Sequence, residues 1–484
     1  MEQTVKKPSL KLNYKRTALI GFAFFGILLL WQVYDTWCPT FLTDIFARNI
    51  YHMTSEELAA DAVAKLDVQW LVGIIMACDN LAALILLPIF GHLSDKAKTP
   101  IGKRMPFILI GTFVAAIAFP FIPLFFHLNN IVAMVIMMAI VLMFMMMYRN
   151  PAVSLMPDMT PKPLRAKANG IINIMGYLGG AFATVLGLFL VLSNYINMGD
   201  GDRSKNLWII ELPFAIASVL MVVSALVLFF TVKENKIAEE VRGEMEEGEK
   251  LAEIENPVEE DKPLSKANKI MLWGILIAEF LWFMADNAIG TYLGNYVIYY
   301  MESKSSAITI LTIAGGVASV AGFAIAGFIA DKLGRKWTIS IGLVLTLIAL
   351  VVMIFVMPKE KVLDTKTGLY YAPLPVLLYV IWAVKGFGMA LVHNCSFPMV
   401  VELSTGKTVG KFTSFYYTAS MSAQTITPVL LGLIFKLSKA WRALPIYASS
   451  LILISGLVFT LIVKNIKSNK TKNSKGLEAL GADD

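Results

Sequence analysis

Ionisable side chains that stand alone within long apolar stretches are the residues best suited to do chemistry in this sequence. Asp35, Asp79, Arg149 and Asp286 each occupy such a position. Holding a charge near the centre of a bilayer costs at least ~2.5 kcal/mol, so these residues usually face a cavity or a partner. Apolar surroundings favour the protonated form of a carboxyl group, which can then carry a proton. We expect Asp79 first, Asp35 second and Asp286 third as proton-coupling groups, with Arg149 as counter-ion. A structural hydrogen bond to a neighbouring helix is the alternative role for Asp79.

Aromatic and amide side chains accompany these carboxylates at helical spacing. Glu279 and Asp286 are two helical turns apart and share a face with Trp282. An aromatic ring can cover the apolar C–H face of a sugar while carboxylate and amide groups bind its hydroxyls, although helix packing is the other explanation for the ring. The candidates for substrate binding are Trp282, Asn287, Asn394, His393, Tyr34, Glu279, Lys385 and Gln424.

Basic groups in the same stretches each have two possible roles. Lys385 can neutralise Glu279 or Asp286 across a helix interface, or it can extend to the membrane surface. His393 can transfer a proton or form a structural hydrogen bond. Arg149 can bind sugar hydroxyls as well as a carboxylate, or lie at the membrane surface.

The composition places these residues in a membrane protein. Of 484 residues, 57% are hydrophobic and 16% are charged, and the mean hydropathy is +0.66. Soluble domains are usually about 25% charged, so a soluble enzyme is excluded. Three scattered cysteines and four distant histidines give no disulfide framework or metal motif, and no cofactor is expected. Twelve apolar segments long enough to cross a bilayer cover 18–41, 68–90, 107–126, 131–156, 169–192, 207–232, 270–300, 307–330, 337–356, 375–401, 412–435 and 444–463.

The basic residues indicate an orientation rather than a nucleic-acid partner. With the N-terminus inside, 29 of the 42 Lys and Arg fall in inner loops and tails, and 11 fall in outer loops. This asymmetry predicts that both termini lie in the cytoplasm and that the cell membrane is the location. The first segment is too long for a cleaved signal peptide and is expected to remain as a helix.

A charged linker divides the chain into two six-helix halves. Residues 233–269 contain 12 acidic and 7 basic residues and include the stretch AEEVRGEMEEGEKLAEIE. We expect a solvated cytoplasmic linker with a surface helix, in preference to a regulatory segment. The predicted units are an N-terminal half, 1–232, this linker, a C-terminal half, 270–463, and a disordered tail, 464–484.

The two halves repeat each other. GHLSDKAKTPIGKR follows the second segment, and GFIADKLGRK follows the eighth. A second repeat has a constant offset of 244 residues. It relates Arg149, Asn150 and Asp158 to His393, Asn394 and Glu402. Such loops can form contacts in one conformation that break in another, and they can also be simple tight turns. The residues of these expected latches are Gly91, Asp95, Lys103, Arg104, Gly327, Asp331, Arg335 and Lys336.

These paired loops resemble the signature of the major facilitator superfamily. The expanded first copy, together with PAVSLMPDMTPKPLRAKANGIINIMG, FPMVVE and YYTASMSAQTITP, is more similar to the sucrose-transporter and glycoside:cation symporter branch. The resemblance covers all twelve segments and excludes the linker and tails. It implies an all-α fold of twelve transmembrane helices in two pseudo-symmetric halves. It also implies a sugar symporter that works by alternating access, with the first, fourth, seventh and tenth helices lining a central cavity.

The preferred function is therefore proton-coupled symport of a sugar or small glycoside across the cell membrane. Sodium coupling and proton-driven export of small amphipathic compounds are the alternatives. A membrane-embedded enzyme lacks support, because the sequence has no Ser/His/Asp cluster, phosphate-binding loop or dinucleotide motif. The expected partners are the solute, a coupling cation (H⁺ before Na⁺) and the lipid bilayer.

Overall fold

The fold was analysed in a computed structural model, which describes residues 10–255, 265–365, 367–403 and 409–464. In this part of the chain, twelve helices are long and apolar enough to cross a membrane. Helix formation in these stretches is expected, because a bilayer offers no hydrogen-bond partners and a helix satisfies its own backbone groups. The twelve-helix architecture predicted from the sequence is confirmed.

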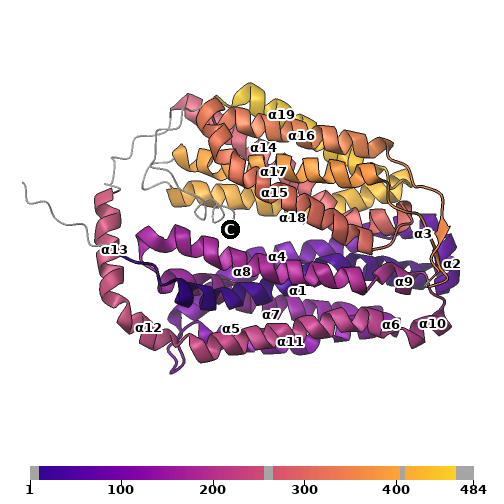
Figure 1. Ribbon diagram of the computed structural model, residues 1–484, viewed down its shortest axis with the longest axis horizontal. Coiled ribbons are helices and arrows are strands. Elements are labelled where there is room, and N and C mark those ends of the chain that lie inside the picture. The colour runs from indigo at the N-terminus through magenta and orange to yellow at the C-terminus, as the bar shows by residue number, and fades with distance from the viewer. Residues whose placement is uncertain (1–9, 256–264, 366, 404–408, 465–484) are drawn as a thin grey trace, which may run out of the picture.

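The N-terminal half contains six spans (Figure 1). They are α1 Tyr14–Tyr51, α4 Gln69–Lys96, α5 Met105–Ala118 with α6 Phe121–His127, α7 Ile131–Asp158, α8 Arg165–Phe189 and α11 Trp208–Thr231.

The C-terminal half also contains six spans and lies beside the first half (Figure 1). They are α14 Lys266–Asn295, which continues as a π-helix over Tyr296–Tyr300, α15 Ser306–Leu333, α16 Arg335–Phe355, α17 Val376–Glu402, α18 Val409–Ser438 and α19 Ala443–Ile462.

Short elements mark the two ends of the bundle (Figure 1). One end, which we call the linker face, carries η1 Lys162–Leu164 and the linker helices α12 Glu234–Glu240 and α13 Arg242–Glu255. The other end, the hairpin face, carries α2 Ser55–Ala60, α3 Ala62–Asp67, α9 Leu192–Ile196, α10 Asp200–Lys205 and the antiparallel strands β1 Val362–Leu363 and β2 Tyr370–Tyr371. The predicted surface helix of the linker is thus present as α12 and α13, whereas the predicted tail lies outside the described residues, apart from Lys464.

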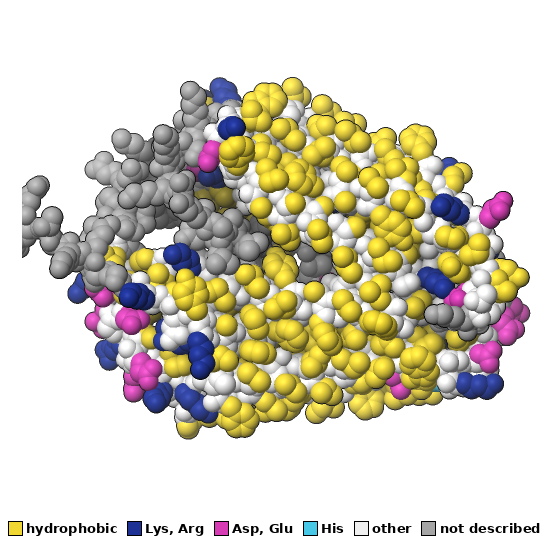
Figure 2. Space-filling view, in the orientation of Figure 1, with side chains coloured by type: hydrophobic (Ala, Val, Ile, Leu, Met, Phe, Trp, Pro, Cys, Tyr) yellow, Lys and Arg dark blue, Asp and Glu magenta, His cyan; other side chains and the backbone are white. Residues whose placement is uncertain are grey.

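Hydrophobic side chains cover the middle of the molecule, and charged side chains gather at its two ends (Figure 2). Val219 of α11, Val320 of α15 and Ile348 of α16, for example, lie well inside their helices and expose 61%, 66% and 53% of their surface. A soluble monomer rarely exposes a continuous apolar surface of this kind, whereas lipid tails cover it at no cost. The band between the two faces is therefore the part that lies in the bilayer.

Close helix packing joins the halves near the hairpin face. A Cβ atom on Gly73 of α4 would lie 2.1 Å from the carbonyl oxygen of Pro428 on α18. One on Gly432 of α18 would lie 2.4 Å from the carbonyl oxygen of Gln69. Both glycines are needed because a side chain at either position would force α4 and α18 apart.

Candidate functional site: a charged cavity between the halves

A cavity of about 660 Å³ lies between the two halves. Helices α1, α4 and α7 form its N-terminal wall, and α14, α15, α17 and α18 form its C-terminal wall. Its volume is in the range of roughly 300–1,000 Å³ that is usual for small-molecule sites. The first, fourth, seventh and tenth transmembrane helices line it as the resemblance implied, and the second, eighth and eleventh line it as well.

The N-terminal wall brings together ionisable residues from three helices. Asp35 of α1, Asp79 of α4 and Arg149 of α7 all line the cavity. The two carboxylates are close enough to act on each other electrostatically, and Arg149 acts on Asp79. Asp79 also accepts a hydrogen bond of 2.6 Å from the backbone N–H of Asn80. This wall therefore holds two acids that interact with each other and one base that interacts with Asp79.

Pro39 contributes to the same wall. It lies inside α1 and lines the cavity one turn after Asp35. Because proline has no N–H, the backbone carbonyl of Asp35 lacks its usual helical partner. The cavity thus borders both the carboxylate of Asp35 and a turn of helix in which one backbone hydrogen bond is missing.

The C-terminal wall is built around an ion pair. Asp286 of α14 and Lys385 of α17 form a hydrogen-bonded salt bridge, and both line the cavity. The ammonium group of Lys385 lies 5.6 Å from the ring centroid of Trp382, one helical turn earlier on α17. The alternative pairing of Lys385 with Glu279 is not the one found. The charges of this wall are therefore neutralised within the wall itself.

Neutral polar groups complete the lining. Asn287 and Gln424 contribute amides, and Thr312 and Ser319 of α15 contribute hydroxyls. Among the described residues, the Oδ1 atom of Asn287 and the indole Nε1 of Trp31 are buried without a hydrogen-bond partner. Buried polar atoms normally have partners, so this acceptor and this donor are available to a bound molecule.

The cavity gathers some of the residues that the sequence singled out and leaves others aside. The four proton-coupling candidates line it, and so do the substrate-binding candidates Asn287, Lys385 and Gln424. The described lining does not include Tyr34, Glu279, Trp282, His393 or Asn394.

The candidates outside the cavity pack within the halves. Trp282 is fully buried and meets Phe459 of α19 edge-on, at a centroid distance of 6.3 Å. Glu279 is also fully buried. The ring of His393 lies against the ring of Phe283, and the two ring centroids are 5.3 Å apart. Glu279, Trp282 and Asp286 follow each other at helical spacing on α14. Asp286 lines the cavity, whereas Glu279 and Trp282 are buried within the C-terminal half.

Two hydroxyl residues of the lining gave no signal in the sequence. Thr312 and Ser319 lie on α15, whose apolar stretch contains no ionisable residue. The Ser319 hydroxyl is 2.9 Å from the carbonyl oxygen of Gly315 and 3.0 Å from that of Gly386 on α17. A hydroxyl bonded to helix carbonyls is common in apolar helices, so sequence alone does not separate this position from ordinary helix packing.

At the linker face, the repeated loops form ion pairs inside each half. In the first half, Arg104 pairs with Asp95 and, at 2.9 Å, with Asp158. In the second half, Arg335 pairs with Glu402 at 2.8 Å. Asp158 and Glu402 are the acids that the 244-residue offset makes equivalent, so the internal repeat extends to the tertiary contacts.

The linker is fastened to the first of these loops. The buried carboxylate of Glu234 on α12 accepts backbone hydrogen bonds of 3.0 to 3.1 Å from Lys103, Arg104 and Met105 at the start of α5. A carboxylate is favourable there, because the first N–H groups of a helix have no partner within the helix. The linker helix therefore belongs structurally to the N-terminal half.

Comparison with known proteins identifies the family. The family model of the Major Facilitator Superfamily matches residues 17–325 and 296–481. No curated protein sequence matches the chain. An inward-open structure of the xylose transporter XylE from E. coli has a TM-score of 0.60 at 16% identity, covering 96% of this chain and 98% of that one.

Other solved structures share the fold at similarly low sequence identity. A bacterial homologue of the iron transporter ferroportin, in an inward-facing state, has a TM-score of 0.61 at 13% identity, covering 93% and 99% of the two chains. The POT family transporter PepTSo has a TM-score of 0.62 at 11% identity, covering 94% of this chain and 98% of that one. Identities this low establish the fold and leave the solute open. By its family model and its fold, the chain is a multi-pass membrane transporter of the Major Facilitator Superfamily.

Proposed function

We propose that the protein is a secondary active transporter that moves a sugar or small glycoside together with a proton by alternating access. The observation that carries the proposal is the cavity between the halves, where Asp35, Asp79 and Arg149 from three helices meet on one wall. Ionisable groups at membrane depth are costly unless they have a function, and a proton-coupled cycle uses them.

The lining supports a neutral, hydroxyl-rich solute. The rings of Trp31 and Trp382 supply flat apolar surfaces, and Asn287 and Gln424 supply amide groups. Because Asp286 and Lys385 neutralise each other, the C-terminal wall presents no net charge to a ligand. A sugar matches this combination, since its C–H faces stack on rings and its hydroxyls pair with amides.

The N-terminal wall supports coupling to a cation. Arg149 can balance one ionised carboxylate, which leaves the other of Asp35 and Asp79 to take up a proton. Protonation of that second acid leaves one ionised carboxylate balanced by Arg149, so the wall carries no net charge and the cost of reorienting the occluded cavity falls. In this cycle the charged empty wall disfavours reorientation, and the protonated wall allows it.

The charge distribution supports cytoplasmic termini and a cytoplasmic linker face. Basic residues are concentrated in loops and tails on that side. The described hydrogen bonds between the halves lie toward the hairpin face, as expected for a cavity closed to the outside and open to the cytoplasm. The cell membrane remains the proposed location.

Sodium coupling is the second candidate, and one observation favours it. Asp35 and Asp79 interact electrostatically, and hard cations prefer sites with several carboxylate oxygens. A sodium ion bound between the two acids would take the place of the proton without changing the rest of the cycle.

Uptake by the purified protein in liposomes tests the function. A panel of labelled pentoses, hexoses and disaccharides is offered under an imposed proton gradient or an imposed sodium gradient. We expect at least one saccharide to accumulate with the proton gradient alone. Accumulation with sodium alone would favour the second candidate. Failure of every saccharide, with efflux of a hydrophobic cation instead, would replace symport by export.

A further inference from the structure

The cavity is closed toward the hairpin face by a buried group of neutral polar side chains from both halves. Asn295, at the end of α14, is fully buried. Its amide nitrogen donates to the hydroxyl of Thr43 at 2.9 Å and to Oε1 of Gln69 at 3.2 Å, and its amide oxygen accepts from Thr40 at 3.0 Å. Gly294, the preceding residue, lines the cavity. We call Asn295, Thr40, Thr43 and Gln69 the Asn295 hub.

A second contact between the halves lies at the α9–α10 segment, residues 192–205. The backbone N–H of Ser193 on α9 donates to the hydroxyl of Ser305 at 3.2 Å, and the N–H of Ser305 donates to the hydroxyl of Ser193 at 2.9 Å. Both serines are buried. This reciprocal pair links the connection between α8 and α11 of the first half to the start of α15 in the second.

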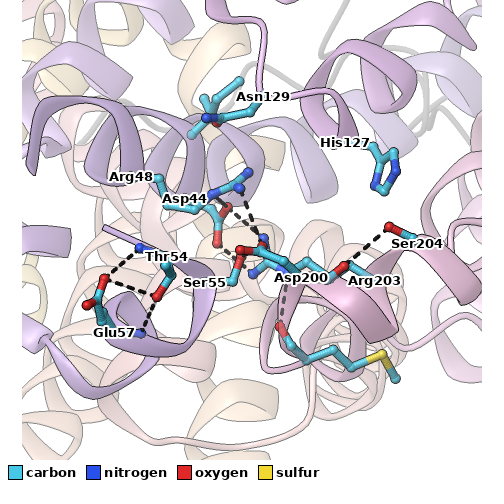
Figure 3. A network of polar contacts seen from close by, with 12 residues as sticks. Asp44, Arg48, Thr54, Ser55, Glu57, His127, Asn129, Asp200, Arg203 and Ser204 are labelled. Atoms are coloured by element: carbon cyan, nitrogen blue, oxygen red, sulfur yellow. Dashed lines mark hydrogen bonds and ion pairs between the residues drawn. The ribbon is translucent and has the colours of Figure 1, made fainter. Parts of the chain in front are cut away.

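The other end of the α9–α10 segment is held by a charged network within the N-terminal half (Figure 3). Arg203 donates to both carboxylate oxygens of Asp44 on α1, at 3.1 and 3.0 Å, and Arg48 donates to the same carboxylate at 2.8 Å. Asp44, Arg48 and Arg203 are all buried. Arg203 also donates to the backbone carbonyl oxygens of Ile196 and Met198, so its side chain ties the segment together.

These two sets of contacts differ in how easily they break. Separating the buried Asp44–Arg203 pair would leave two uncompensated charges inside the protein, which is strongly unfavourable. The hub and the serine pair contain only neutral groups, which exchange their hydrogen bonds for bonds to water at little cost. An opening motion at the hairpin face therefore breaks these neutral contacts, together with the ion pair between Asp67 and the exposed Lys439 that also joins the halves there, and leaves the buried Asp44–Arg203 pair intact.

We propose that the α9–α10 segment is a clasp over the hairpin face. The Asp44–Arg203 ion pair keeps it attached to the N-terminal half in both conformations, and the Ser193–Ser305 pair and the Asn295 hub break when the cavity opens to that face. Asn295 and Ser305 are the gate contacts in this arrangement, and Asp44 and Arg203 are positioning residues. The inference depends on alternation of the cavity and is independent of the solute.

Spin-label distances in nanodiscs test the clasp, after replacement of the three native cysteines. One label pair joins the exposed positions Asp202 on α10 and Glu360 in the C-terminal half. We expect Asn295→Ala, the milder Asn295→Ser and Ser305→Ala to raise the population of a longer distance roughly fivefold. Ser204→Ala is the matched control, because that hydroxyl bonds only to the carbonyl of Asp200 within α10, and it should match the wild type.

A second label pair, Asp202 with Leu128, reports whether the clasp stays on its own half. Leu128 is 60% exposed and follows α6 of the N-terminal half. This label pair should give one narrow distance population in the wild type and in the gate variants. The distribution should broaden in Arg203→Lys, because lysine keeps the charge but cannot donate to both carboxylate oxygens of Asp44 in the same way. The proposal is overturned if Asn295→Ala, Asn295→Ser and Ser305→Ala leave the first distance as in Ser204→Ala. It is also overturned if the gate variants give two populations of the distance between the labels at Asp202 and Leu128. Neither readout requires transport, so failure of the proposed sugar symport leaves this test intact.

Discussion

The two walls of the cavity carry the same kinds of charged group in opposite arrangements. On the C-terminal wall, one acid and one base from neighbouring helices form a direct pair, Asp286 with Lys385. On the N-terminal wall, Asp35 interacts with Asp79, and one arginine, Arg149, interacts with Asp79. A closed pair is already neutral and gains little from a proton, whereas an excess of acids is relieved by one. From this difference we propose that cation coupling belongs to the N-terminal wall and that the C-terminal wall orients the solute.

Neutralising an acid of the N-terminal wall should have the largest effect. Asp79→Asn mimics the protonated acid permanently, so it should still exchange solute at equal concentrations but should lose at least tenfold in accumulation against a gradient, which is about 1.4 kcal/mol or more of coupling. Asp35→Asn should behave in the same way if that acid carries the proton. Both activities are measured in one liposome preparation. Accumulation by both variants in response to a pH gradient would move coupling to Asp286 and reverse the comparison.

Breaking the pair on the C-terminal wall should act mainly on stability. Lys385→Ala leaves Asp286 charged and partly buried, which should lower the free energy of unfolding by about 2–3 kcal/mol. The double variant Asp286→Asn with Lys385→Gln removes both charges and should recover most of the loss. Thermal unfolding in detergent measures each change. Equal destabilisation by the double and single variants would show that the pair acts through something other than mutual neutralisation.

Two tryptophans of the C-terminal half, Trp382 and Trp282, should separate binding from packing. Trp382→Ala removes a ring from the cavity and should weaken apparent solute affinity roughly 2- to 10-fold, in line with ~0.5–1.5 kcal/mol for a stacking contact. Trp282→Ala empties a fully buried position and should instead lower thermal stability, by about 3 kcal/mol or more. Uptake kinetics and unfolding are measured for both. If only Trp282→Ala weakens the apparent affinity, the solute binds at the face of α14 that carries Glu279 and Trp282, as the sequence suggested.

The smallest effect is expected at the linker face. Asp95 pairs with buried Arg104, whereas Asp331 is exposed and no ion pair joins it to another described residue. Asp95→Asn should shift the conformational balance by up to about 1 kcal/mol, and Asp331→Asn should shift it less. Cysteine labelling from the linker face measures the balance. Equal shifts in the two variants would show that the ion pair of Asp95 with Arg104 does not influence the conformational balance.

The sequence predicted the fold well because the bilayer imposes simple rules. A span needs about 20 apolar residues in helical form, so length and composition place most helices within a few residues, although α1 continues ten residues beyond its predicted end at residue 41. The paired loops and the 244-residue offset indicated equivalent positions, and the structure contains the ion pairs Lys103–Asp158 and Arg335–Glu402 at those positions. Isolated charges inside apolar segments were informative for a related reason: their cost restricts them to a cavity or a partner. Asp35, Asp79, Arg149 and Asp286 all line the cavity.

Neutral residues were harder to place, since they carry no such cost. Trp282 and Trp382 both lie in apolar helices beside charged residues, and only Trp382 lines the cavity. Tyr34 and Asn394 likewise share helices with lining residues but lie outside the described lining. The ionisable Glu279 and His393 also lie outside it, and the carboxylate of Glu279 is buried without a hydrogen-bond partner among the described residues, so isolated charge did not place every such residue in the cavity. Which side of a nearly uniformly apolar helix faces the cavity depends on its rotation against its neighbours. Close glycine contacts such as Gly73 against Pro428 set that rotation.

By itself, the sequence determined the membrane class, the twelve helices, the duplicated halves and the ionisable residues that must avoid lipid, because each of these follows from the energetics of apolar length and isolated charge. The tertiary structure alone decided which acid pairs with which base, which aromatic rings face the cavity, and that Ser193, Ser305 and Asn295 meet across the hairpin face. Those facts depend on contacts between residues far apart in the sequence. Asp286 and Lys385 are 99 positions apart and meet when helices pack within the C-terminal half, whereas the contacts of Ser193, Ser305 and Asn295 form only when the two halves pack together.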